Sequence, residues 1–285
     1  MKINKSLPVL VTGATGYIAG WVVKNLLDEG ITVHAPIRDT TNTQKRVHLD
    51  KLAENSSGKI KYFESDLMIE DSYKEAMKGC ELVIHTASPF VMDSKDPQKE
   101  VIEPALKGTQ NVLKTVNETE SVKRVVLTSS IAAIYGNSID GQSVEGGLFN
   151  ESMWNTTSTS TDGEYSYSKT VAEKEAWKIC EEQKRWDLVV INPGFVLGPS
   201  LNPNALFESK KFMLQMGNGD LKSGAPDITM GMVDVRDVSK AHVIAGFSET
   251  AKGRHILSAG THTLLETGGF IKEKFGDKYP VPTRN

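Results

Sequence analysis

The chain has 285 residues, of which 39% are hydrophobic and 24% charged, and its formal net charge is −3 at pH 7. This composition is typical of a soluble globular protein, and the weak negative charge argues against a nucleic acid or an anionic membrane as partner. Two cysteines, Cys80 and Cys180, exclude a disulfide framework. The sequence shows no signal-like segment and no apolar run near the roughly 18 residues of a membrane span. Together with the low cysteine content, these features predict a cytoplasmic protein.

A turn rich in glycine follows the first apolar run, which covers residues 7–11, and an apolar helical pattern begins at Ile18. A buried strand that enters a helix through such a turn directs backbone N–H groups and the positive end of the helix dipole at one spot, which suits a pyrophosphate. Gly13 is predicted to make the tight turn, Gly16 to allow close approach, and Ala19 to let the helix pack on the strand. The alternative is an ordinary strand–helix turn.

Four further strands are predicted before the middle of the chain, separated by helices or crossovers. The expected strands are residues 31–37, 60–64, 81–86 and 124–128, and the expected helices are residues 44–52, 72–77 and about 97–116. Pro36 cannot donate to a sheet ladder, so we place it at the end of its strand. This alternation predicts a parallel, doubly wound sheet of the α/β class.

Polar or small residues stand at the ends of these strands, where parallel sheets bind their ligands. They are Gly13, Arg38, Asp66, Ala87, Ser88, Ser129 and Ser130. Their agreement with the glycine-rich turn favours a Rossmann-type dinucleotide-binding sheet.

The second half of the chain is predicted to complete this sheet and to add a small lobe. Residues 135–162 are polar and irregular, which is typical of a functional cover or a mobile segment. Helices are expected at about 165–182, 238–247 and 263–275, and strands at 188–191, 232–235 and 255–258. We expect a Rossmann domain at residues 1–195, with a return segment at about 231–260, and a small C-terminal substrate-binding lobe made of residues 196–230 and 261–285.

Tyr165 and Lys169 lie four residues apart on a predicted helix, so both side chains point to one face. Ser130 ends the fifth strand and is expected to face the same cleft. Hydride transfer to a carbonyl builds negative charge on oxygen, which a serine hydroxyl can hold and a tyrosine can protonate. Lowering the tyrosine pKa by about three units requires roughly 4 kcal/mol. A lysine ammonium about 5 Å away supplies roughly 3 kcal/mol of this, and an oxidised nicotinamide could supply the rest.

The chain resembles the extended short-chain dehydrogenase/reductases, and within them the branch of dihydroflavonol reductases, cinnamoyl-CoA reductases and microbial aldehyde/ketone reductases. The resemblance rests on Thr-Gly-Ala-Thr-Gly-Tyr-Ile-Ala at 12–19, on Tyr-Ser-Tyr-Ser-Lys at 165–169, and on residues 37–39, 85–89, 127–130, 192–199 and 233–238. It implies Ser130 as the catalytic serine, Tyr165 as acid/base and Lys169 as its partner. Asn111 is either part of a proton relay or a helix-surface amide.

The same resemblance implies the residues that contact the ligands. The cofactor residues would be Thr12, Gly13, Thr15, Gly16, Tyr17, Ile18, Arg38, Lys45, Asp66, Leu67, Thr86, Ala87, Ser88, Thr128, Tyr165, Lys169, Pro193, Gly194, Phe195 and Val196. The substrate residues would be Ser88, Phe90, Ser130, Ile131, Tyr135 and Phe195.

The cofactor is predicted to be NADP(H). An acidic residue at the end of the second strand would favour NAD, whereas Arg38 stands there and Lys45 follows, and both suit a 2′-phosphate. Asp39 keeps NAD possible. The histidines show no metal-ligand spacing, so no metal is expected.

We therefore predict an NADPH-dependent reductase of an aldehyde or ketone, with an apolar or aromatic substrate, acting as a monomer or homodimer. A nucleotide-sugar epimerase or dehydratase is the first alternative. Against it, no carboxylate occurs in residues 131–134 and no arginine lies between Trp186 and Val235. A non-catalytic NADP-sensing protein is the second alternative, and the presence of both Tyr165 and Lys169 counts against it.

Overall fold

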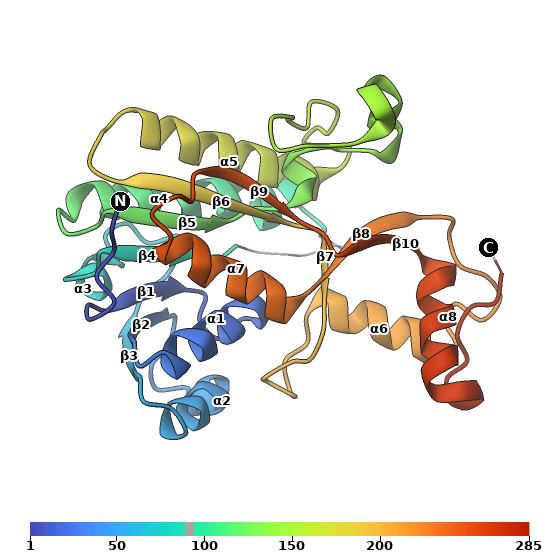
Figure 1. Ribbon diagram of the computed structural model, residues 1–285, viewed down its shortest axis with the longest axis horizontal. Coiled ribbons are helices and arrows are strands. Elements are labelled where there is room, and N and C mark those ends of the chain that lie inside the picture. The colour runs from blue at the N-terminus through green and yellow to red at the C-terminus, as the bar shows by residue number, and fades with distance from the viewer. Residues whose placement is uncertain (89–93, 285) are drawn as a thin grey trace.

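The computed structural model describes residues 1–88 and 94–284, and its main body is a parallel seven-stranded sheet (Figure 1). Its order is β3-β2-β1-β4-β5-β6-β9. The strands are β1 (Val9–Thr12), β2 (Thr32–Ile37), β3 (Lys59–Glu64), β4 (Leu82–His85), β5 (Arg124–Thr128), β6 (Asp187–Pro193) and β9 (Gly253–Leu257). The order reverses between β1 and β4, so the crevice where such sheets bind ligands opens at that point. This confirms the predicted α/β doubly wound fold.

Pro36 lies inside β2 rather than at its last residue. Pairing of β2 with β1 is limited to Val33 and His34, whereas pairing with β3 continues to Ile37. The strand therefore tolerates Pro36, because its pairing with β1 has already ended there.

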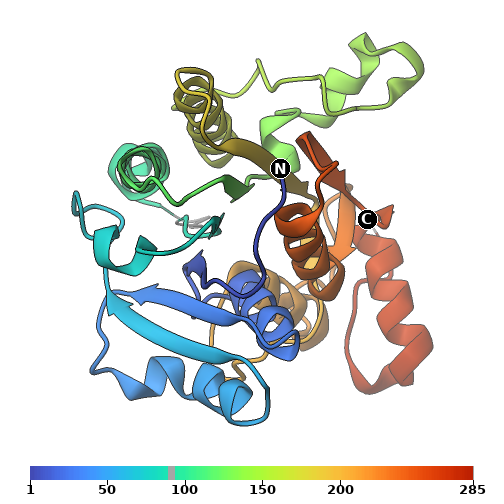
Figure 2. The same ribbon diagram turned by 60° about the vertical axis from the view of Figure 1, so that its left-hand side comes forward.

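Helices cover both faces of the sheet, as Figure 2 shows. One face packs against α1 (Tyr17–Asp28), α2 (Thr43–Glu54) and α7 (Val235–Phe247), and the other against α3 (Lys74–Met77), α4 (Glu103–Glu118) and α5 (Glu164–Glu181). Each interface is a continuous cluster of buried aliphatic side chains. The helix expected at 97–116 is divided into a π-helical turn, Gln98–Ile102, and α4. This two-sided burial fixes the sheet as a rigid base for the residues at its strand ends.

A second sheet of three strands lies beyond the main one, in the order β10-β8-β7. It is formed by β7 (Phe195–Leu197), β8 (Thr229–Asp234) and β10 (Gly260–Thr263), and α6 (Glu208–Asn218) and α8 (Leu264–Phe275) lie next to it (Figure 1). The expected return strand is β8 and belongs to this small sheet, whereas α7 and β9 return to the main body. The division at residue 195 into two functional lobes stays a proposal.

Candidate active site

The turn between β1 and α1 has the geometry that a phosphate needs. Gly13 has φ +67, and a Cβ atom there would lie 3.1 to 3.2 Å from atoms of Ala87. The N–H of Gly16 donates to the carbonyl of Gly13 at 2.8 Å, and α1 then begins without any side-chain cap. The first N–H groups of α1 are thus left for a ligand, and the residues present fit a dinucleotide pyrophosphate.

Thr12 fixes the neighbouring strand end rather than facing solvent. Its fully buried hydroxyl oxygen accepts the N–H groups of Thr86 and Ala87, each at 3.1 Å. The hydroxyl hydrogen is therefore directed at Nδ1 of His85, 2.8 Å away. This network locks the ends of β1 and β4 together beside the glycine turn.

The structure brings Ser130, Tyr165 and Lys169 together. Ser130 follows β5, and its hydroxyl hydrogen-bonds to Tyr165 on the first turn of α5. Its Oγ also accepts the N–H of Ala132 at 3.1 Å, which fixes the rotamer. Nζ of Lys169 lies 5.8 Å from the centre of the Tyr165 ring, and Lys169 is 8% exposed. The predicted serine, tyrosine and lysine thus form one cluster at the carboxyl end of the sheet.

Burial dominates the pKa of Tyr165 in the protein alone. It raises this pKa to about 12, and the hydrogen bond from Ser130 opposes the rise only in part. Burial also lowers the pKa of Lys169 to about 8, against the pull of Glu173. The expectation that Lys169 and an oxidised nicotinamide together lower the tyrosine pKa stays a prediction.

Arg38 and Lys45 lie as predicted at the end of β2 and in the first turn of α2, and both are exposed. Among the described residues, neither side chain makes an ion pair. The carboxylate of Asp39 instead accepts hydrogen bonds from the N–H and hydroxyl of Thr41, at 2.8 and 2.6 Å. These bonds hold the pKa of Asp39 below its usual value. Asp39 thus forms its hydrogen bonds within its own loop, while the side chains of Arg38 and Lys45 remain available to bind an anion.

Asn111, whose part in a proton relay stays a prediction, contacts a neighbouring turn. Its amide donates to the carbonyl of Leu67 at 2.7 Å, and Asp66 in the same turn accepts the N–H of Met68 at 2.8 Å. Asn111 is therefore an anchor from α4 for the turn that is predicted to meet the adenine.

The stretch predicted to line the nicotinamide joins the two sheets. Pro193 ends β6, and Phe195 begins β7. Gly194 between them donates to the carbonyl of Leu257 at 2.9 Å, and a Cβ atom at this position would collide with the carbonyl of Gly231. Only glycine therefore fits where the chain crosses from one sheet to the other.

Aromatic pairs flank this crossing and the turn after Ser130. Phe195 meets Phe212 edge to face at 5.0 Å between ring centres, and Tyr135 stacks on Phe149 at 4.2 Å. Ile131 opens the short helical turn that follows Ser130. The substrate residue predicted at Phe90 lies outside the described residues.

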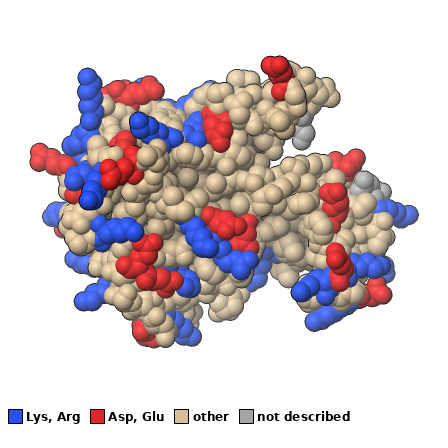
Figure 3. All heavy atoms as spheres, in the orientation of Figure 1, with Lys and Arg blue, Asp and Glu red and all other residues tan. Residues whose placement is uncertain are grey.

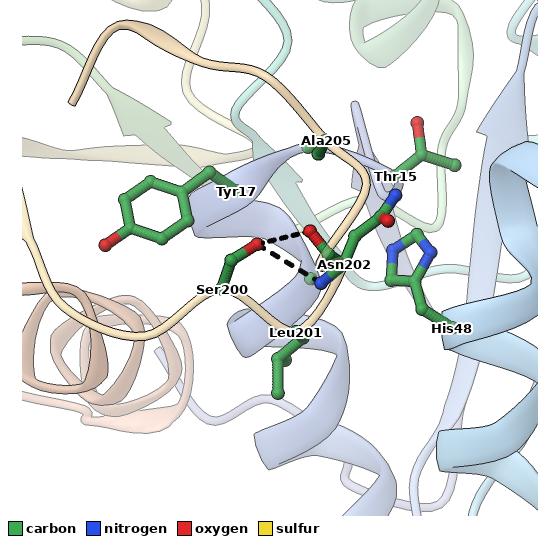
Figure 4. A pocket seen from close by; sticks show the side chains of 9 residues that line it. Thr15, Tyr17, His48, Ser200, Leu201, Asn202 and Ala205 are labelled. Carbon is green, nitrogen blue, oxygen red and sulfur yellow. Dashed lines mark hydrogen bonds between the residues drawn. The ribbon is translucent and has the colours of Figure 1, made fainter. Parts of the chain in front are cut away.

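Residues 198–207, here called the strap, cross the glycine turn, a contact that no local sequence pattern indicates. The Tyr17 hydroxyl donates to the carbonyl of Gly198 at 2.8 Å, and its ring stacks on Phe207 at 4.0 Å. Trp21 donates to the carbonyl of Pro199 at 2.8 Å. Figure 4 shows the small pocket that results, lined by Thr15, Tyr17, His48 and the strap residues Ser200, Leu201, Asn202 and Ala205. Tyr17, predicted to contact the cofactor, therefore holds the strap.

Two buried histidines lie next to the site, and their burial should make the free energy of unfolding depend on pH. His85 and His242 are 1% and 0% exposed. Burial, with a contribution from the charge of Lys169, lowers the pKa of His85 to about 3. Burial lowers that of His242 to about 4, against a hydrogen bond to the carbonyl of Val238. Because an unfolded histidine has a pKa of about 6.5, the unfolded chain binds more protons below that pH.

The stability contributed by these histidines is present above about pH 6.5 and is lost as the pH falls toward their folded-state pKa values. We expect the free energy of unfolding to drop by about 3 kcal/mol between about pH 6.5 and about pH 5. Urea titrations at the two pH values measure this difference. A free energy of unfolding that is constant or higher at the lower pH would contradict the buried, neutral state of both rings.

The described residues hold no group of three or more side chains suited to a metal ion, and no described helix is long and apolar enough to cross a membrane. On the face in Figure 3, positive and negative side chains are interspersed. The predicted cytoplasmic location and the monomeric or dimeric state stay predictions.

The chain is similar to known proteins in both sequence and structure. The model of the NAD dependent epimerase/dehydratase family matches residues 9–257. The chain is 42% identical to a cinnamoyl-CoA reductase of Medicago truncatula, over 94% of this chain and 80% of that protein. It is 36% identical to tetraketide alpha-pyrone reductase 1 of Arabidopsis thaliana, over 97% and 83%.

Among solved structures, Gre2 of Candida albicans in complex with NADPH superimposes with a TM-score of 0.82 at 32% identity, covering 97% of this chain and 85% of that one. These matches confirm the resemblance to the extended short-chain dehydrogenase/reductases and to their reductase branch. The chain belongs to the NAD dependent epimerase/dehydratase family.

Proposed function

We propose that the protein is an NADPH-dependent reductase of aldehydes or ketones. The observation that carries this proposal is the hydrogen bond between Ser130 and Tyr165, with Lys169 one helical turn further on, at the same sheet edge as the glycine turn. The NADPH complex of Gre2 and the reductase names of the relatives support the choice of reaction and cofactor.

Gly13, Gly16, Arg38 and Lys45 would hold the phosphates of the cofactor, and residues 193–196 would lie against its nicotinamide. When bound, the cofactor supplies the hydride that reduces the carbonyl carbon. Gly194 within this segment admits no side chain, because a Cβ atom there would collide with the carbonyl of Gly231.

The protein's own residues would control the oxygen of the substrate. Ser130 donates a hydrogen bond to the carbonyl oxygen, and Tyr165 gives that oxygen a proton, so the product is an alcohol. The pKa of about 12 keeps Tyr165 protonated at neutral pH, which is the form that reduction needs. The Lys169 ammonium then stabilises the tyrosinate left behind.

An apolar or aromatic carbonyl compound suits this site better than a sugar nucleotide. Ile131, Tyr135 and Phe195 bring hydrocarbon surface to the region beside Ser130. A sugar diphosphate favours arginine partners, and none occurs in the sequence between Trp186 and Val235. The family also contains epimerases and dehydratases by name, which keeps that class as the second candidate.

A panel of aldehydes and ketones mixed with NADPH and the protein tests the proposal. Loss of the nicotinamide absorbance band with formation of alcohol is the expected result. Conversion of a sugar nucleotide without net loss of NADPH would favour an epimerase instead.

Replacing Arg38 by alanine is expected to raise the KM for NADPH by about ten- to a hundredfold, because a charge-assisted hydrogen bond to the 2′-phosphate contributes about 1.5 to 3 kcal/mol. NADH lacks that phosphate, so its KM should change little. Initial rates at varied NADPH and NADH concentrations measure both values. Arg46→Ala is the matched control, since Arg46 pairs with Asp50 at 3.7 Å and lies over Tyr62. An equal rise for both cofactors in Arg38→Ala would overturn the NADPH assignment.

A further inference from the structure

Glu173 is a buried carboxylate, one helical turn beyond Lys169 on α5, that joins three separate elements. Its side chain is 0% exposed. It accepts hydrogen bonds from the hydroxyl of Ser129 at 2.6 Å, from the amide of Asn192 at 2.9 Å and from Nε of Arg254 at 2.5 Å. These donors come from the end of β5, from β6 and from β9. A single carboxylate therefore ties the helix that carries Tyr165 and Lys169 to three neighbouring strands.

The partners of Glu173 stand next to the residues that act on the substrate. Ser129 immediately precedes Ser130 in the chain. The amide of Asn192 also donates to the carbonyl of Ser130, at 3.1 Å, so Asn192 bridges Glu173 and the catalytic serine. A change in the position of the Glu173 carboxylate would thus move the serine turn relative to α5.

Arg254 extends the same network to residues 135–162, here called the cover loop. Its guanidinium donates to the carbonyls of Glu151, at 3.0 Å, and of Met153, and it lies 3.8 Å from the ring centre of Trp154. Arg254 itself is 7% exposed. The buried ion pair of Glu173 and Arg254 therefore fastens the cover loop to the catalytic helix.

The charge of Glu173 is also distinctive among the groups that face Lys169. In the described part of the chain, these groups are Tyr165 and Glu173 on α5 and His85 on β4, with Arg254 of β9 behind Glu173. Tyr165 and His85 are neutral at neutral pH, because burial raises the pKa of the first and lowers that of the second. Glu173 is thus the anion that this set offers to the buried ammonium.

We propose that Glu173 is a positioning residue for carbonyl reduction, acting as the buried counter-ion of Lys169 and as the anchor of the turn that presents Ser130. This inference rests on the proposed reductase function. It assigns to Glu173 an electrostatic role in addition to its hydrogen bonds.

The test compares the wild type with the double variant Glu173→Gln/Arg254→Met. Both members of the pair are changed, because removing Glu173 alone would leave Arg254 as an unpaired buried charge. Loss of the Glu173 charge lowers the pKa of Lys169, and loss of the Arg254 charge behind it offsets part of this change. The alkaline limb of the pH profile of kcat/KM is therefore expected to shift to lower pH by about half a unit to one unit. At about pH 8 this shift lowers kcat/KM by roughly two- to fivefold.

A second readout uses the protein alone. The reactivity of the Lys169 amine toward acetic anhydride, followed by mass spectrometry as a function of pH, reports its protonation directly. Its midpoint is expected to fall by about the same half to one unit. Glu173→Asp keeps the charge and should retain both midpoints near their wild-type values, which preserves a test if the double variant does not fold.

The matched control is Arg124→Met/Asp187→Asn, which removes an ion pair between buried Arg124 and partly exposed Asp187, joined at 2.6 Å. These residues begin β5 and β6, at the sheet edge opposite to Ser130. It should leave both midpoints unchanged. If the Glu173→Gln/Arg254→Met variant loses activity by one factor at every pH and its labelling midpoint stays in place, Glu173 is only structural and the proposal is overturned. If the wild type reduces no carbonyl, the proposed function fails, and the labelling midpoint still decides whether Glu173 is the counter-ion.

Discussion

Tyr165→Phe is expected to lower kcat for carbonyl reduction by about a hundred- to ten-thousand-fold, the usual contribution of a positioned general acid. The substitution removes only the phenolic oxygen that Ser130 contacts. The ring keeps its place on α5, so the KM for NADPH should stay nearly constant. Steady-state rates at saturating NADPH measure the effect.

Tyr167→Phe provides the control on the same helix. Tyr167 lies two residues further along α5, so its side chain points about 200° around the helix axis from that of Tyr165. Loss of its hydroxyl should change kcat by less than about threefold, as for a residue outside the reacting cluster. A Tyr165→Phe variant with full activity would falsify the acid assignment.

Gly13→Ala is expected to weaken NADPH binding by about ten- to a hundredfold, which corresponds to about 1.4 to 2.8 kcal/mol. An alanine would have to adopt φ +67, and its Cβ would lie 3.1 Å from Cα of Ala87. To relieve that contact, either the glycine turn or the end of β4 must move. Either movement displaces the residues that are proposed to hold the phosphates. Fluorescence titration with NADPH measures the loss of affinity.

Gly79→Ala is the control that separates the effect of backbone strain at positive φ from the effect of a steric contact. Gly79 has φ +74, and a Cβ atom there would meet nothing within 4 Å. It should lose about 1 to 2 kcal/mol of stability, as any residue other than glycine does at this φ, with unchanged NADPH affinity. Equal NADPH affinity in Gly13→Ala and the wild type would show that the turn does not hold the cofactor.

The sequence was sufficient to predict the sheet and the grouping of Ser130, Tyr165 and Lys169, because both depend on local patterns. Buried strands appear as short apolar runs, and β5 matches its predicted bounds, 124–128. Glycine and polar residues directly after the strands identify the binding edge, since the carboxyl ends of parallel strands meet there. The spacing of Tyr165 and Lys169 on one helix face needs no tertiary information.

Long-range contacts account for what the sequence did not reveal. Glu173 and Arg254 are 81 residues apart, and nothing in either local sequence indicates that they pair. The contact of Tyr17 with Gly198 spans 181 residues. The short strands β7 and β10 take their form from pairing with β8 rather than from their own residues. The burial that raises the pKa of Tyr165 also depends on the whole fold rather than on the local sequence.

In the proposed reaction, hydride passes from NADPH to a carbonyl carbon while Tyr165 supplies the proton. NADPH that carries deuterium at the transferred position, an aromatic aldehyde, and mass spectrometry of the product test this reaction directly. The wild type is expected to form an alcohol with one deuterium on carbon, and Tyr165→Phe is expected to form almost none. Tight binding of NADPH with no labelled alcohol from any aldehyde or ketone tested would contradict the proposed reaction.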